Sequence, residues 1–321
     1  VGVRRRTLPC WLFLCRMNDL QRRLIIGLST HQESRMRVVL VPVADRPECA
    51  RALKSAFGIA QAQRADLVGC HIRPHRDSAV RMPGLGSGAD AQWAASSRDR
   101  DPKRDSRNAR TLFEKAATEA GHRVASRPRA DGTPVAIWQE RVGSPDRVMP
   151  IVGPMSDLIV LSRPAAKGGR RASVFLMEAL MHGCRPILLL PQRPVRQPGQ
   201  NILVAWNQRE EASRAVAAAM PLLTAATAVT VAVAGDERAP GPKASHLVHY
   251  LRHHGVQADV LKTKGKRPVE ELEQGYQQAG ADLLVMGAYS RHRLRERIFG
   301  GVTDYMLRRS SLPVFLYHSG G

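Results

Sequence analysis

The residues of this chain best suited to bind a ligand lie near its C-terminus. An apolar run from Ala281 to Met286 is typical of a buried parallel strand, and Gly287 ends it. We expect Gly287 to let the backbone turn tightly at the carboxyl end of this strand. Gly300 and Gly301 then precede a predicted helix from Val302 to Arg309. Because glycines leave the main chain accessible and a helix N-terminus attracts anions, this stretch predicts a phosphate site.

Four arginines lie in the loop between the strand and the helix. They are Arg291, Arg293, Arg295 and Arg297. A guanidinium group matches phosphate oxygens in a bidentate way, whereas alternation with other side chains is equally typical of a solvated loop. We expect Arg291 and Arg293 to contact the ligand.

This order of residues resembles the C-terminal signature of the universal stress protein family, whose nucleotide-binding members carry Gly-x2-Gly-x9-Gly-(Ser/Thr). The pattern falls here on Gly287, Ser290, Gly300 and Gly301. Ser290 can keep a hydroxyl group near the phosphate position, and Gly301 lacks one. The pattern leaves open whether Thr303, which follows Val302, replaces it. The resemblance implies that the second half binds ATP or a related adenine nucleotide, with a nucleotide-free protein as the alternative.

The resemblance also separates the two halves of the chain. In the family an Asp at the end of the first strand contacts the adenosine, and here Asn207 takes that place in the second half. The first half has Ala44 there, and it has Ser162 and Ser173 where the second half has glycines. We expect these side chains to fill the space of a pyrophosphate, so that the first half binds no nucleotide.

A duplicated pattern organises the chain. Ile202 to Trp206 repeats the opening apolar run Val38 to Val43, and the sequence after Glu211 echoes that after Glu48. Each copy predicts five strands alternating with helices, which right-handed crossovers place on both faces of a sheet. The expected fold class is α/β, with two doubly wound, mostly parallel five-stranded sheets of the Rossmann-like, adenine nucleotide alpha hydrolase-like type. Ligands of such sheets bind at the carboxyl ends of the strands.

The domain boundaries follow from composition. We place a first domain at residues 36–193, a linker at 194–200 and a second domain at 201–319. Residues 77–107 are rich in Ser, Gly, Arg and Asp and predict a mobile loop, after which Asn108 is placed to cap a helix. A weak third strand is predicted to start at Val124.

Residues 1–35 differ from the rest of the chain. They combine a basic start with apolar runs that are too short to span a bilayer, and Met36 follows directly. We expect a disordered or upstream-translated extension, with a membrane-surface arm as the less favoured alternative.

The resemblance implies an intrachain pseudo-dimer. The last strands of the two halves, Pro186–Leu190 and Pro313–Tyr317, are expected to pair edge to edge, which protects two sheet edges. A further homodimer is left open.

The net charge of +21 raises the question of a nucleic-acid partner. The arginines are scattered over the chain and follow no nucleic-acid motif, so this function is the less favoured one. Five cysteines without a CxxC pair indicate reduced thiols in a cytoplasmic protein.

Catalytic motifs are missing from the sequence. It has no Gly-x-Ser-x-Gly elbow, no Lys-Ser/Thr phosphate loop and no His-Glu-x-x-His. His246, His249 and His253 have helical spacing, which favours a solvated helix face over a metal site because no carboxylate or Cys joins them. We therefore expect a stress-linked binding and signalling protein with an unknown protein partner rather than an enzyme, although slow ATP hydrolysis is compatible with such a site.

Overall fold

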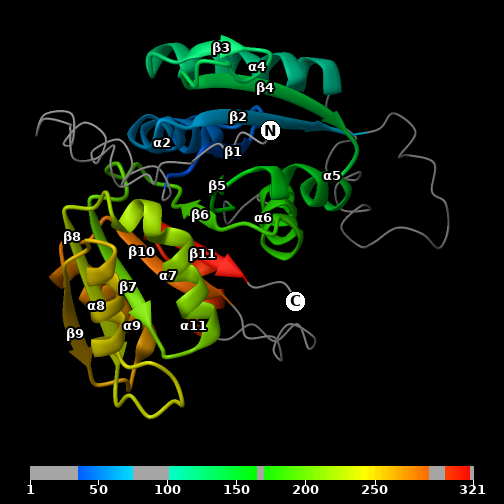
Figure 1. Ribbon diagram of the computed structural model, residues 1–321. Coiled ribbons are helices and arrows are strands. Elements are labelled where there is room, and N and C mark those ends of the chain that lie inside the picture. The colour runs from blue at the N-terminus through cyan, green and yellow to red at the C-terminus, as the bar shows by residue number, and fades with distance from the viewer. Residues whose placement is uncertain (1–34, 75–100, 165–169, 289–300, 319–321) are drawn as a thin grey trace, which may run out of the picture. The chain divides into compact units, whose positions relative to one another are not determined.

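The computed structural model describes residues 35–74, 101–164, 170–288 and 301–318 (Figure 1). The chain divides into two compact units, residues 1–35 and 36–321. All elements below belong to the second unit.

One sheet of 11 strands runs through this unit in the order β3-β4-β2-β1-β5-β6-β11-β10-β7-β8-β9. The first half supplies β1 (Val38–Pro42), β2 (Asp66–Arg73), β3 (Arg123–Ala125), β4 (Val135–Val142), β5 (Leu158–Ser162) and β6 (Ile187–Leu190). The second half supplies β7 (Asn201–Trp206), β8 (Ala228–Ala234), β9 (Ala258–Thr263), β10 (Leu283–Ala288) and β11 (Val314–His318). Every pairing within a half is parallel.

Helices cover both faces of this sheet, as expected for a doubly wound fold (Figure 1). One face carries α2 (Pro47–Gln63), α4 (Pro102–Glu119), α7 (Glu210–Leu223) and α8 (Ala244–His253). The other carries α5 (Pro145–Val152), α6 (Arg170–His182), α9 (Pro268–Gln278) and α11 (Gly301–Arg308), with the short 3-10 helix η4 (Gly153–Met155) after α5.

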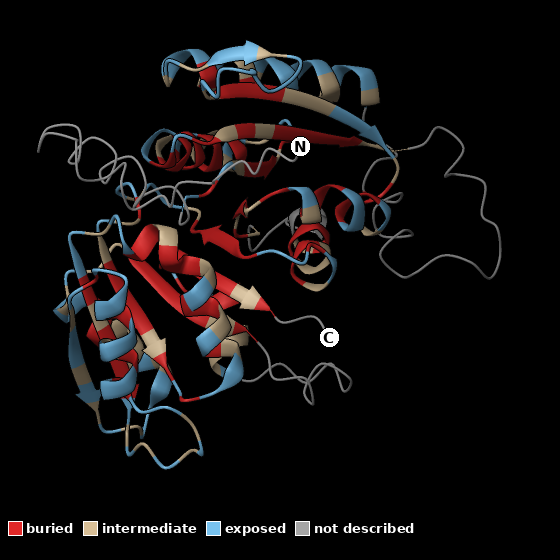
Figure 2. Cartoon of the chain, in the orientation of Figure 1, coloured by how far each residue is buried: buried red, intermediate tan, exposed pale blue. Residues whose placement is uncertain are grey.

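The two faces arise because successive side chains of a strand point to opposite sides. In β1, Val39 and Val41 join the core under α2, whereas Leu40 joins the core on the other face. Both faces of the central strands are buried, as Figure 2 shows. Continuous apolar runs such as that of β10 are therefore the sequence pattern of these strands.

The two halves meet through their last strands. β6 pairs antiparallel with β11, so that Phe315 lies opposite Leu188 and both side chains are fully buried. The expected edge-to-edge pairing of Pro186–Leu190 with Pro313–Tyr317 is thus confirmed. It joins the two expected sheets into one and removes two open edges.

The weak strand predicted at Val124 is present, but it is not the third strand of the repeated pattern. The predicted strand at Val124 is only the three-residue edge strand β3, and β4 is the third strand of the repeated pattern. Among the described residues, the second half has the five strands that were predicted, and the first half has six. β4 was not predicted because Gln139 to Arg141 are polar and its last three residues, Glu140 to Val142, are exposed, which weakens its apolar pattern.

The helix after the predicted mobile loop begins earlier than expected. Pro102 is its first residue, and the Asp101 side chain accepts a hydrogen bond from the Lys103 backbone N–H at 2.9 Å. Asn108, the predicted cap, lies inside α4 and donates to Asp45 Oδ2 at 2.7 Å. The loop prediction is therefore wrong for residues 102–107, and residues 77–100 lie outside the described part of the chain.

No helix within the described ranges combines the length and the apolar character that a bilayer-spanning helix needs.

Candidate functional site

A cavity of about 320 Å³ lies at the carboxyl ends of β7, β8 and β10, under α9 and α11. Its walls are Ala205, Trp206, Asn207, Arg209, Glu211, Ala232, Ala234, Pro268, Leu272, Met286, Gly287, Gly301, Val302 and Thr303. This is the edge of a parallel sheet at which ligands of doubly wound folds bind. A volume of this size is typical of a small-molecule site.

Five residues singled out from the sequence line this one cavity, although up to 96 residues separate them in the chain (303 minus 207). They are Asn207, Gly287, Gly301, Val302 and Thr303. The other four candidates, Ser290, Arg291, Arg293 and Gly300, lie outside the described residues.

Gly287 is a glycine because a helix passes close to it. A Cβ atom there would lie 2.5 Å from the backbone carbon of Glu211 and 2.7 Å from the nitrogen of Ala212. Gly287 is not among the residues with a left-handed backbone, so the predicted tight turn is wrong. The missing side chain lets the first turn of α7 pack directly on the end of β10.

Ser162 shows how the first half makes the equivalent contact. Its hydroxyl group donates to the carbonyl oxygen of Glu48 at 2.8 Å, in the first turn of α2. Glu48 and Ser162 correspond to Glu211 and Gly287 in the second half. The side chain of Ser162 is therefore directed at α2, and the expectation that it fills the space of a pyrophosphate is wrong.

Gly301 borders open space. Apart from its chain neighbours and the backbone of its own helix, no atom of the described residues would lie within 4 Å of a Cβ atom placed on it, and its backbone is outside the left-handed region. Among the described residues, none therefore plugs the cavity beside the first turn of α11.

Three helices begin at the cavity, and helix N-termini favour the binding of an anion. The N-terminal residues of α7, α9 and α11 contribute Glu211, Pro268 and Gly301 to its walls. The first N–H groups of a helix have no intrahelical partner and carry the positive end of the helix dipole. The acidic side chain of Glu211 interacts favourably with the dipole of its own helix and opposes a nearby anion.

The polar wall at the end of β7 is held by hydrogen bonds. The Asn207 Oδ1 atom accepts the backbone N–H of Arg209 at 3.1 Å, at the start of α7. Gln208 between them has a left-handed backbone with φ of 62°, and its side chain donates to the Gly241 carbonyl at 3.2 Å. Because the Asn207 oxygen is engaged locally, its amide nitrogen is the group that can reach a ligand.

The inner wall is apolar. Trp206 is buried and donates through Nε1 to the carbonyl oxygen of Pro242 at 2.8 Å. Ala232, Leu272 and Met286 complete this wall. Such a surface fits a planar ring, while the helix N-termini fit an anion.

Two carboxylates fix the helices around the cavity. Glu273 of α9 accepts the hydroxyl of Tyr305 in α11 at 3.0 Å, and this bond raises the pKa of Tyr305. Glu271 accepts backbone N–H groups of Gly265 at 2.6 Å and Lys266 at 2.9 Å. A side-chain hydrogen bond from Thr263, followed by the backbone bonds, lowers the pKa of Glu271 to about 2.

Sequence patterns missed several residues of the cavity wall, among them Trp206, Arg209, Pro268 and Leu272. Trp206 and Arg209 could have been predicted from their place at and just after the end of a repeated strand, because the carboxyl ends of parallel strands lie at one edge of the sheet. The residues of α9 gave no signal, since helix position depends on packing.

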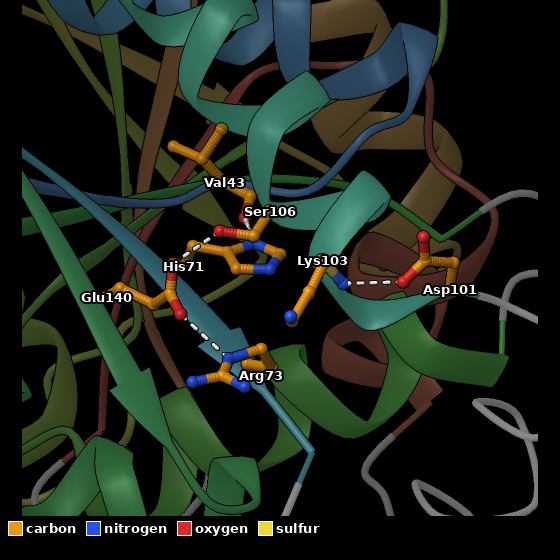
Figure 3. Close-up of polar contacts among 7 residues, drawn as sticks. All are labelled: Val43, His71, Arg73, Asp101, Lys103, Ser106 and Glu140. Carbon is orange, nitrogen blue, oxygen red and sulfur yellow. Dashed lines mark hydrogen bonds and ion pairs between the residues drawn. The ribbon is translucent and has the colours of Figure 1, made fainter.

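A second polar cluster lies in the first half, between β2, β4 and α4 (Figure 3). Glu140 accepts from the Ser106 hydroxyl and from Arg73 Nε, the latter at 2.7 Å. These bonds lower the pKa of Glu140, with the Ser106 bond as the largest cause. His71 is buried, and its Nδ1 atom lies 2.9 Å from the Val43 carbonyl oxygen. Both carboxylate oxygens of Glu140 are thus engaged: the bond from Ser106 fastens α4 to the sheet, and the bond from Arg73 joins β2 to β4.

The histidines with helical spacing lie on the exposed face of α8. His246 Nδ1 accepts the backbone N–H of Lys243 at 3.2 Å, and the rings of His249 and His253 pack edge to face. Within the described part of the chain, no group of three or more His, Cys, Asp or Glu is arranged to hold a metal ion.

The fold and the cavity can now be compared with known proteins. Residues 198–318 match the model of the Universal stress protein family. A search of curated protein sequences finds no significant match.

Solved structures share the fold over both halves. A universal stress protein from Archaeoglobus fulgidus is 13% identical, with a TM-score of 0.63, over 88% of this chain and 96% of that one. A functionally unknown protein from Pseudomonas aeruginosa is 14% identical, with a TM-score of 0.51, over 89% of this chain and 93% of that one. Residues 198–318 therefore belong to the universal stress protein family and are joined to a first half of the same fold.

Proposed function

We propose that the second half of the chain binds an adenine nucleotide, ATP or a related one, and that the protein acts in the stress response by binding rather than by catalysis. The open space beside Gly301 carries this proposal. There the free N–H groups of α11 border a cavity that also has an apolar wall.

Each part of a nucleotide matches a part of this cavity. The phosphates would lie against Gly301, Val302 and Thr303, where the helix dipole and the Thr303 hydroxyl favour negative charge. The base would lie on the apolar wall around Leu272 and Met286. Asn207 would donate to the nucleoside through its amide nitrogen.

Four further residues belong to the proposal through the sequence pattern alone. Ser290 and Gly300 continue the phosphate-binding pattern, and Arg291 and Arg293 add positive charge between them.

Binding without catalysis accounts for the side chains at the cavity. The only acidic side chain in its described wall is Glu211, which lies in the first turn of α7. A general base would have to lie within hydrogen-bonding distance of an attacking water molecule, and a lone carboxylate fixed at a helix start supplies no partner to orient it.

Gly301→Val tests this function. Among the described residues, apart from its chain neighbours and the backbone of its own helix, no atom lies within 4 Å of a Cβ at this position, so the variant should fold normally. Valine places two apolar methyl groups, which donate no hydrogen bond, against the proposed phosphate position. We expect ATP to bind the wild-type protein and to bind Gly301→Val at least about tenfold more weakly, because a displaced phosphate contact is worth ~1.5–3 kcal/mol. Calorimetric titration measures both dissociation constants.

Ser245→Val is the matched control. Ser245 is an exposed residue in the first turn of α8, away from the cavity walls. It should leave ATP affinity unchanged. If wild-type protein purified without adenine-absorbing ligand fails to bind added ATP, the nucleotide role is wrong, and the alternative of a nucleotide-free protein that acts through a protein partner takes its place.

A further inference from the structure

The side chain of Arg163 extends from the first half of the chain into the second half and is buried there. This residue follows β5 directly and is only 4% exposed. Its Nη2 atom donates to the carbonyl oxygens of Met306 at 2.7 Å and Leu312 at 3.3 Å. Its Nε atom donates to the carbonyl oxygen of Leu307 at 3.2 Å. All three acceptors belong to the last turn of α11 or to the segment that follows it.

These bonds satisfy a helix end that water does not reach. The last four carbonyl groups of a helix have no intrahelical partner. In α11 the Tyr305 carbonyl accepts the backbone N–H groups of Arg309 and Ser310. The carbonyls of the buried residues Met306 and Leu307 are left, and they accept Arg163. A cation at this end also interacts favourably with the helix dipole.

The position of Arg163 is itself fixed from the first half. Its backbone N–H donates to the Leu190 carbonyl at 2.7 Å, at the end of β6. The Gln192 side chain donates to its carbonyl oxygen. Burial lowers the pKa of Arg163 to about 10, so the guanidinium group stays charged at neutral pH. Within the described ranges it forms no ion pair with a carboxylate, and its Nη1 atom has no hydrogen-bond partner.

The other end of α11 lines the cavity. The helix has 8 residues, which is about two turns, and its first three residues are Gly301, Val302 and Thr303. So short a helix moves as one body. A group that holds its last turn therefore also sets where its first N–H groups point.

We infer that Arg163 is a positioning residue for the cavity of the second half: by holding the C-terminus of α11, it places the N-terminus of α11 for an anionic ligand. This inference rests on the proposed function. The arrangement works in one direction only, because the second half has Ala288 at the position of Arg163. The first half thus contributes to the site of the second half through this contact.

The test uses the full chain with Arg163→Met and Arg163→Lys. Methionine fills similar space without donors, and lysine keeps the charge but loses the planar fork that reaches several carbonyls. Arg185→Met is the control, because Arg185 also donates to a backbone carbonyl, that of Pro154 at 2.8 Å, but at an exposed site within the first half.

Two measurements separate positioning from general stability. Hydrogen exchange of the α11 amides should become at least about tenfold faster in Arg163→Met, with a smaller change in β10. The dissociation constant for ATP, measured where the variant is fully folded, should rise by about tenfold or more. In both measurements, Arg163→Lys should give values between those of the wild type and Arg163→Met, and Arg185→Met should give the wild-type values.

Each outcome decides the inference. If folded Arg163→Met exchanges its α11 amide hydrogens at the same rate as the wild-type protein, the inference is wrong. It is also wrong if exchange becomes faster by the same factor throughout the second half. If the wild-type protein binds no ATP, the proposed function fails, while the exchange measurement still decides whether Arg163 positions α11. If Arg163→Met does not fold, Arg163→Lys is judged by the same two measurements.

Discussion

Asp157 and Asp282 occupy the same place in the two halves and make the same contact. Asp157 Oδ2 accepts the backbone N–H groups of Arg37 at 2.6 Å and Val38 at 2.9 Å, where β1 begins. Asp282 accepts the N–H groups of Gly199 at 2.7 Å and Asn201 at 3.1 Å, where β7 begins. The residue before β5 thus fastens the start of β1, and the residue before β10 fastens the start of β7; the strands of each pair are neighbours in the sheet.

Replacing either carboxylate should destabilise the protein. Asp282→Ala leaves part-buried N–H groups without an acceptor, which costs ~1.5–3 kcal/mol for bonds to a charged group. Urea unfolding measures this loss. Asp236→Ala is the control, because Asp236 forms an exposed ion pair with Arg238 and such pairs contribute about 0–1 kcal/mol. Equal effects of the two changes would contradict the fastening role.

Gly287→Ala should destabilise the second half. Its Cβ atom would lie 2.5 Å from the backbone of Glu211, and neither α7 nor β10 can give way without losing core contacts. We expect a loss of ~1–3 kcal/mol in the free energy of unfolding. Gly301→Ala should be nearly neutral, since nothing lies within 4 Å of its added atom. A neutral Gly287→Ala would show that α7 shifts freely on the sheet.

Glu271 should contribute stability that depends on pH. Its pKa is lowered from 4.5 to about 2, so its contribution is fully present above pH 4.5 and is lost as pH falls towards 2. Glu271→Gln keeps an acceptor without the charge. Wild-type and Glu271→Gln proteins should therefore differ in urea midpoint above pH 4.5 and converge as pH falls from 4.5 towards 2. A difference that stays constant with pH would exclude the charge as the cause.

Gly301→Ser should strengthen ATP binding if the proposed site is right. The change adds a hydroxyl group at the position where the family pattern carries Ser or Thr, and the site has room for it. One added hydrogen bond to phosphate is worth ~0.5–1.5 kcal/mol, or about twofold to tenfold in affinity. Titration of both proteins with ATP measures the change. Weaker binding by Gly301→Ser would place the phosphate elsewhere.

Much of the fold followed from local patterns. The apolar runs of β1, β5, β7 and β10 predicted buried parallel strands, and the duplication predicted two doubly wound halves. The strand β4 was missed because three consecutive residues of it, Gln139 to Arg141, are polar. The start of α4 was missed because its cap, Asp101, follows a polar segment.

The sequence also predicted part of the candidate site, but not the physical role of each residue in it. The family resemblance selected Asn207, whereas a glycine at a strand end and a glycine before a predicted helix selected Gly287 and Gly301. The reason for Gly287 could not be predicted, since it depends on where α7 packs.

The amino-acid sequence by itself determined the duplicated α/β architecture and the edge at which a ligand would bind, because strand and helix periodicities act over a few neighbouring residues. Only the tertiary structure decided that Arg163 reaches Met306, 143 residues away in the chain, and that Ser162 bonds to α2. Such contacts depend on the order of strands in the sheet and on helix packing, which bring together residues that no local pattern relates.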